Sequence, residues 1–328
     1  MLRKLLIVCL FSLTACSGWL AYYASTPQPL SQLPLEFSLK HGSSLKGVAK
    51  QLTAAGVLSE PWNFVVMARL LGKAGAIKAG NYQLESSLTP LQLLRKITEG
   101  DVSQSKITFI EGWSIYQLRS ALDAHPSISH DTKGLDEREL LKLVDAQENT
   151  LEGLIFPDTY YFSNGMSDTA ILKRAYRIMQ QKIADAWQER APDLPYASPY
   201  EALIMASIVE KETGKASERP QIAAVFINRL RIGMRLQTDP TVIYGLGQSF
   251  DGNLRKRDLT ADTAYNTYTR AGLPPTPIAM PGYESIQAAL HPAETKAIYF
   301  VAKGNGSHQF SSSLEEHNRA VNQYQRSK

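Results

Sequence analysis

Two glutamates lie two residues apart in the run Ala206-Ser-Ile-Val-Glu-Lys-Glu-Thr213. A carboxylic acid can donate and accept protons, so either glutamate could serve as a general acid or base. If the run is helical, each residue turns by about 100° from the last, and Glu210 and Glu212 point in very different directions. The sequence therefore predicts that only one of the two acids faces the core.

Helical phase distinguishes the two glutamates. The apolar side chains of the predicted helix fall on one arc, with Glu212 near its middle and Glu210 on the opposite side. A carboxyl that continues an apolar stripe is either paired or keeps its proton, because burial raises its pKa. Such a group can act as a proton donor, although the pattern equally allows Glu212 to reach solvent from the last turn. Glu210 is expected to lie on the solvated face, as a bystander or a weak modulator of its neighbour.

The helix that carries these acids has clear boundary signals. Ser198-Pro-Tyr-Glu201 matches a capping box with proline at the first helical position. A second helix is expected after it, capped by Ser217 and stopped at Gly233. Residues 236–245 and 264–275 are predicted as loops whose polar side chains can hydrogen-bond hydroxyl and acetamido groups.

Several kinds of site are missing from the sequence. It has no H-E-x-x-H motif, no G-x-S-x-G motif and no P-loop, so we expect neither a metal nor a cofactor. His308 and His317 are interpreted as structural. The only two cysteines, Cys9 and Cys16, lie in the apolar N-terminal segment. The net charge of +4 comes from dispersed residues and predicts no nucleic-acid binding.

An uncharged segment, residues 5–24, opens the chain and has about the length of a membrane-spanning helix. With Arg3 and Lys4 before it, the positive-inside rule predicts a transmembrane anchor over residues 1–24, with the rest of the chain outside the cytoplasm. A cleaved signal peptide is one alternative. A second is a lipid anchor, since the residues before Cys16 resemble a bacterial lipobox.

The rest of the chain predicts an α+β fold in two parts. A proline-rich linker over residues 25–34 is followed by a small subdomain over 35–104, in the order strand, helix, helix, strand, helix. Its opening resembles LysM-like glycan-binding modules, and a plain structural domain is the alternative. Residues 105–328 are predicted to form a larger mixed helical and β domain with a C-terminal hairpin. Its aromatic segment 151–162 can be either a sugar-stacking surface or core.

Several long motifs together resemble the MltG (YceG-like) family of endolytic murein transglycosylases. They are A-S-I-V-E-K-E-T-G at 206–214, V-F-I-N-R-L at 225–230, L-Q-T-D-P-T-V-I-Y-G at 236–245, Y-N-T-Y at 265–268 and F-P-D-T-Y at 156–160. In that family the catalytic acid is the second glutamate of the E-K-E-T run, which is Glu212 here. The resemblance also implies a single N-terminal span and a LysM-like subdomain ahead of the catalytic domain.

The resemblance implies cleavage of the β-1,4 bond between N-acetylmuramic acid and N-acetylglucosamine in nascent peptidoglycan, with formation of a 1,6-anhydro sugar. It implies a bacterial inner-membrane protein with a periplasmic catalytic domain that ends strand elongation, with peptidoglycan synthases as possible partners. Gln237, Asp239, Asn266 and Tyr268 are hypothesised to orient the glycan. Two alternatives stay open: a hydrolytic muramidase that uses Glu212 with Asp239, and a non-catalytic peptidoglycan-binding scaffold.

Overall fold

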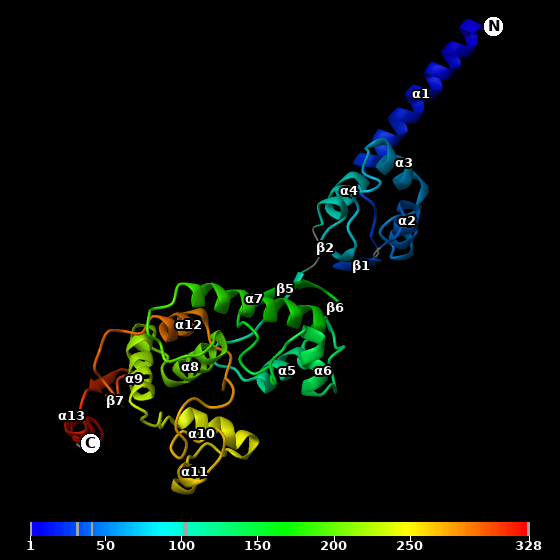
Figure 1. Cartoon of the computed structure of the whole chain (residues 1–328). Coiled ribbons are helices and arrows are strands. Elements are labelled where there is room, and N and C mark those ends of the chain that lie inside the picture. Colours follow the sequence, from blue (N-terminus) through cyan, green and yellow to red (C-terminus); the bar gives the residue numbers. More distant parts are fainter. Residues whose placement is uncertain (1, 31–32, 41, 101–103, 327–328) are drawn as a thin grey trace. The chain divides into compact units, whose positions relative to one another are not determined.

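The computed structural model describes residues 2–30, 33–40, 42–100 and 104–326. The chain forms two compact units, which Figure 1 shows with the elements labelled. The first comprises Met1–Lys106 with Tyr161–Met166, and the second comprises Ile107–Tyr160 with Ser167–Lys328.

The N-terminal helix α1 covers Leu2–Ser25. Within the residues that the structure describes, no helix combines the length and the apolar character needed to span a membrane. The predicted transmembrane anchor is therefore not shown, and membrane attachment stays a prediction. Cys16, the alternative lipid-anchor site, is a free and exposed cysteine. The predicted linker contains residues 31–32, which lie outside the described residues.

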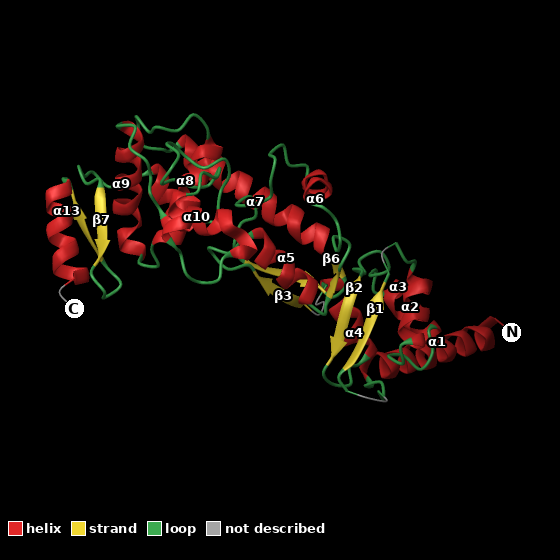
Figure 2. Cartoon of the chain, turned by 90° about the horizontal axis from the view of Figure 1, so that it is seen from below, coloured by secondary structure: helices red, strands yellow, loops and turns green. Residues whose placement is uncertain are grey.

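The first unit contains a two-stranded sheet covered by helices, in the predicted order. Strands β1 and β2 pair antiparallel (Figure 2). The side chains of β1 alternate between buried and exposed, as a strand with one covered face requires. The elements are β1 (Leu35–Leu39), α2 (Leu45–Ala54), α3 (Trp62–Leu70), β2 (Gly80–Leu84) and α4 (Pro90–Glu99). A capping box at Thr89 begins α4, and Gly100 ends it in the left-handed conformation.

The elements from residue 104 onward are mostly helices. They are accompanied by three two-stranded sheets, β3–β5, β4–β6 and β7–β8. The helices are α5 (Ile115–Ala124), α6 (Glu137–Val144), α7 (Asp168–Gln188), α8 (Pro199–Glu212), α9 (Arg219–Arg231), α10 (Asp239–Leu246), α11 (Lys256–Thr260), α12 (Tyr283–Leu290) and α13 (Leu314–Val321). The strands are β3 (Gln104–Thr108), β4 (Ile128–Ser129), β5 (Thr159–Ser163), β6 (Met166–Ser167), β7 (Tyr299–Ala302) and β8 (His308–Ser311). The fold is thus α+β, mostly helical with small sheets, and the predicted C-terminal hairpin is confirmed as β7–β8.

Helix α8 lies at the centre of the second unit, where it packs against α12, α9, α7 and α10. Every residue of Ala202–Val209 is buried, so the helix is covered on all sides. A helix that is apolar all round is typical of a core position. Glu210 and Glu212 lie in its last turn, where it leaves this core.

Three local expectations were wrong or are now decided. Residues 239–246 form helix α10 where a loop was predicted. The loop was predicted because Pro240 and Gly245 are typical turn residues, but proline is well tolerated in a first helical turn. Glu218, at the end of a short 3-10 turn, precedes α9 in place of the predicted Ser217 cap. In the aromatic segment, Phe156, Tyr160 and Phe162 are buried, so it is mainly core.

Candidate active site

Glu212 is the last residue of α8 and is half-buried. The hydroxyl of Thr238 donates a hydrogen bond to its Oε1 atom. Burial raises the pKa of the Glu212 carboxyl, the Thr238 hydrogen bond opposes this, the charge of Asp239 raises the pKa further, and His308 and Arg229 lower it. The net direction is upward, which favours a protonated acid that remains within reach of a substrate.

Glu210 does not lie on a solvated face, so that expectation is wrong. Its side chain is only 7% exposed. It accepts hydrogen bonds from the Gly282 amide at 3.0 Å and the Ser285 hydroxyl at 2.6 Å, and it pairs with Arg219 at 3.4 Å. These contacts fix the start of α12 against the end of α8, so Glu210 is a structural partner and not a free acid.

A cluster of three buried threonines places the Thr238 hydroxyl on Glu212. The Thr238 N–H donates to Thr267 Oγ1 at 3.1 Å, and the Thr238 carbonyl accepts from Thr241 Oγ1 at 2.8 Å. The Thr241 and Thr267 hydroxyls are 2.9 Å apart. Gln237 precedes the cluster with a φ of 49°, a left-handed conformation that costs energy outside glycine, and its N–H donates to the Thr267 carbonyl at 3.1 Å.

Arg229 supports the same segment from α9. Its guanidinium is buried, donating from Nε to the Ile298 carbonyl at 2.7 Å and from Nη1 to the Leu236 carbonyl at 2.5 Å. It also lies over the Tyr299 ring, 5.6 Å from the ring centre. Its positive charge lowers the pKa of Glu212, which means that it stabilises the carboxylate form of this acid.

The structure brings two further predicted residues together. The Tyr268 hydroxyl donates to Asp239 Oδ1 at 2.5 Å. Asp239 is exposed and begins α10, where the helix dipole favours a negative charge. Burial and the hydrogen bond to Asp239 raise the pKa of Tyr268, which therefore stays a neutral donor. The charge of Asp239 raises the pKa of Glu212, and the charge of Glu212 raises the pKa of Tyr268, so both residues belong to the surroundings of Glu212.

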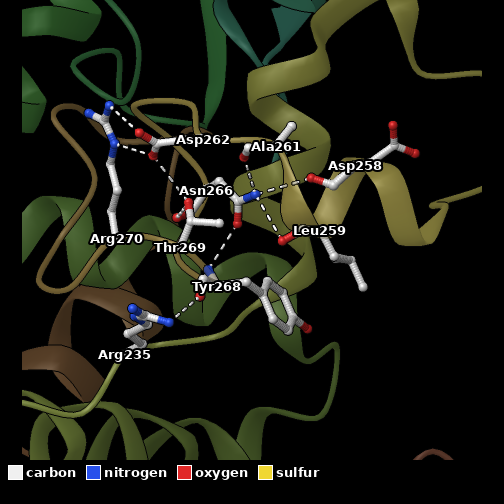
Figure 3. A network of polar contacts seen from close by, with 9 residues as sticks. All are labelled: Arg235, Asp258, Leu259, Ala261, Asp262, Asn266, Tyr268, Thr269 and Arg270. Carbon is white, nitrogen blue, oxygen red and sulfur yellow. Dashed lines mark hydrogen bonds and ion pairs between the residues drawn. The ribbon is translucent and has the colours of Figure 1, made fainter.

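Asn266 was predicted to contact substrate, which requires an accessible side chain, but the structure buries it. It is 1% exposed, and its amide nitrogen donates to the carbonyls of Asp258, Leu259 and Ala261 at 3.1, 3.2 and 2.6 Å. Its Oδ1 atom accepts from the Tyr268 amide at 2.9 Å. Figure 3 shows this network at the end of α11. Asn266 thus organises the loop that carries Tyr268, whereas Gln237 is exposed beside Thr238.

Sequence reasoning missed Thr238, Arg229 and Glu152 as parts of this region. Thr238 and Arg229 lie inside two of the motifs noted above, at 236–245 and 225–230. Their polar side chains within these motifs are the signal by which the sequence could have indicated them. Glu152 is 1% exposed, and burial raises its pKa to about 7.

His308, expected to be structural, pairs through Nδ1 with Glu218 at 2.7 Å. Among the described residues, no three His, Cys, Asp or Glu side chains form a group that could hold a metal.

Comparison with known proteins agrees with these motifs. The pattern of the YceG-like family matches residues 37–323. An endolytic murein transglycosylase from Bacillus subtilis (strain 168) is 32% identical over 337 residues, covering 95% of this chain and 91% of the relative. One from Streptococcus pneumoniae (strain D39) is 25% identical over 88% of this chain, which spans 58% of that longer relative.

A solved structure is also similar. The crystal structure of a YceG-like protein from Listeria monocytogenes shares 30% identity and a TM-score of 0.56, covering 87% of this chain and 97% of that one. The family match extends over nearly the whole chain after its first helix and includes the segments that carry Glu212, Thr238 and Asp239. The chain belongs to the YceG-like family.

Proposed function

We propose that this protein is an endolytic murein transglycosylase that cleaves the β-1,4 bond between N-acetylmuramic acid and N-acetylglucosamine, with Glu212 as general acid and then general base. The observation that carries the proposal is the half-buried Glu212 carboxyl, whose pKa is raised and which Thr238 orients. The relatives named as endolytic murein transglycosylases support the choice of substrate.

In the first step, protonated Glu212 donates its proton to the glycosidic oxygen, and the bond from that oxygen to the anomeric carbon breaks. Positive charge then develops at the anomeric carbon. Asp239, whose carboxylate is oriented by Tyr268, is suited to stabilise this charge.

In the second step, the Glu212 carboxylate takes the proton of the 6-hydroxyl of the same sugar, and that oxygen bonds to the anomeric carbon. The 1,6-anhydro ring forms without water, and Glu212 is again protonated. Intramolecular attack gains from a high effective concentration, so no second carboxylate is needed to activate a nucleophile.

A hydrolytic muramidase is the second candidate, favoured by the position of Asp239 near Glu212. In that reaction Asp239 would activate water or attack the sugar, and the product would carry a reducing end. A non-catalytic scaffold would bind glycan without cleaving it.

The test is to incubate wild type and Glu212→Gln with purified uncrosslinked glycan strands and analyse the ends by mass spectrometry. We expect anhydro ends from wild type and no cleavage by Glu212→Gln, which keeps folding and strand binding. Reducing ends would select the muramidase, and equal phenotypes of both proteins would select the scaffold.

We also propose attachment at the inner membrane through the N-terminal segment, with the catalytic unit in the periplasm, or attachment by a lipid on Cys16. A tethered enzyme would meet strands close to the synthases from which they emerge and would end their elongation. Metabolic labelling with a radiolabelled fatty acid distinguishes the two anchors, since only a lipoprotein incorporates the label and Cys16→Ala would abolish that incorporation.

A further inference from the structure

A hollow of about 840 Å³ lies in the second unit, between the start of α5 and helix α10. Tyr116 and Gln117 contribute from α5, and Ile243, Tyr244 and Gln248 from α10 and the turn after it. This volume lies in the range of pockets that bind small molecules or segments of a polymer. Nothing in the proposed cleavage step uses these side chains.

The hollow adjoins the segments that carry the catalytic acid. Lys211, the residue before Glu212, lines it and donates from Nζ to the Gly112 carbonyl at 3.2 Å. Pro240, which follows Asp239, lines it from the other side. Glu212 and Asp239 are thus each one position along the chain from a residue that lines the hollow, so a strand that continues from them toward α5 and α10 would enter it.

The lining has the character of a carbohydrate site. Tyr116 is 63% exposed at the hollow. Tyr244 and Tyr265 pack edge to face with their ring centres 4.9 Å apart. Aromatic rings cover the apolar faces of sugars, and the amides of Gln117 and Gln248 can hydrogen-bond hydroxyl and acetamido groups.

Glu152 fixes the two walls to each other. The amide N–H of Ile115, in the first turn of α5, lies 3.1 Å from both oxygens of its carboxyl. The hydroxyl of Tyr244, on α10, also hydrogen-bonds to this carboxyl. A buried acid that links both sides gives the hollow a defined shape before any ligand enters it.

We propose that this hollow binds the sugar residues of the glycan strand that extend beyond the bond cleaved at Glu212. The inference rests on the proposed function and adds a binding surface to it. It explains how the protein selects a position within a strand, because a strand that fills the hollow binds more tightly than one too short to reach it.

The experiment measures binding of glycan strands without stem peptides to the full-length chain carrying Glu212→Gln, which does not cleave them. Strands of one disaccharide repeat are compared with strands of several repeats by calorimetry. We expect the longer strands to bind more tightly, and Tyr116→Ala to weaken only their binding, by roughly three- to tenfold. Tyr116→Trp should retain the longer-strand affinity.

The matched control is Tyr161→Ala, which removes a tyrosine of similar exposure, 55%, that does not line the hollow. Equal affinities of Tyr116→Ala and the control for long strands would overturn the proposal, as would a requirement for stem peptides. Cleavage by wild type is measured separately. If wild type cleaves strands but Tyr116→Ala does not weaken strand binding, only the proposed role of the hollow is rejected. A protein that binds long strands through Tyr116 but forms no anhydro ends rejects the proposed reaction alone.

Discussion

The Thr238 hydroxyl donates a hydrogen bond to the Glu212 carboxyl, and this links the loop before α10 to the end of α8. The bond stabilises the carboxylate form and so lowers the pKa of Glu212 against the upward effect of burial. In the proposed reaction the acid must release and regain one proton, so this hydroxyl sets how readily it does so.

Removing that hydroxyl should shift the pH dependence. Thr238→Val keeps the shape of the side chain but loses the donor, so the pKa of Glu212 rises and the alkaline limb of the activity profile moves to higher pH. We expect roughly a tenfold loss of kcat as well, because the carboxylate form is less well stabilised. Thr238→Ser retains the donor and should restore a profile close to wild type. An unmoved limb in Thr238→Val would show that Thr238 does not act on the reacting acid.

Asp239→Asn should move the same limb in the opposite direction. The negative charge of Asp239 raises the pKa of Glu212, so its removal lowers that pKa. The alkaline limb of the activity profile then moves to lower pH. The lytic mechanism predicts a partial loss of rate with anhydro ends as the only product. Complete loss of cleavage, with reducing ends in the wild-type products, would instead identify Asp239 as the second acid of a hydrolase.

Asn266→Ala should act through the loop and not through substrate affinity. The change removes a side-chain amide whose NH2 group donates to three nearby backbone carbonyls and whose oxygen accepts from the Tyr268 amide, so we expect the free energy of unfolding to fall by about 1–3 kcal/mol. Denaturant unfolding measures this, with Asn253→Ala as the control at an exposed asparagine. A strongly raised KM at unchanged stability would return Asn266 to the group of substrate ligands.

Glu152→Gln should change how stability depends on pH. Burial raises the pKa of Glu152 from 4.5 to about 7, so the native state binds its proton more tightly than the unfolded chain does. Stability from this group is complete below pH 4.5 and falls as pH rises toward 7, by up to about 3 kcal/mol. The glutamine variant lacks this fall, whereas Glu294→Gln, at an exposed position, should retain it. Parallel pH curves for wild type and Glu152→Gln would exclude the titration.

Much of the local structure could be predicted because caps and periodicity agree. Ser198 accepts from the Glu201 amide and Pro199 begins α8, as its capping pattern indicates. The Glu201 carboxyl reaches the Ala197 amide instead of that of Ser198, so the capping box is only half formed. Helix α10 was missed because its eight residues have no marked polar face and begin with a proline motif that is also common in loops.

The helix wheel could not by itself distinguish the surroundings of Glu210 from those of Glu212. It assumes one buried face, but α8 is buried all round, and Glu210 is more enclosed in partners than Glu212. The motif shared with the family pointed to Glu212, and only tertiary contacts show that Glu210 is held by Arg219, Gly282 and Ser285. These partners lie up to 75 residues away along the chain, beyond the reach of any local pattern.

Three consecutive residues at the end of α8 each hold a different segment. Glu210 holds the start of α12, Lys211 holds Gly112 at the hollow, and Glu212 meets Thr238 before α10. A helix advances by about 100° per residue, so a single insertion or deletion in α8 would present the wrong side chain to all three segments at once. The last turn of α8 therefore connects three segments, and the proposed reaction depends on the rotation of this helix about its axis as well as on the Glu212 carboxyl.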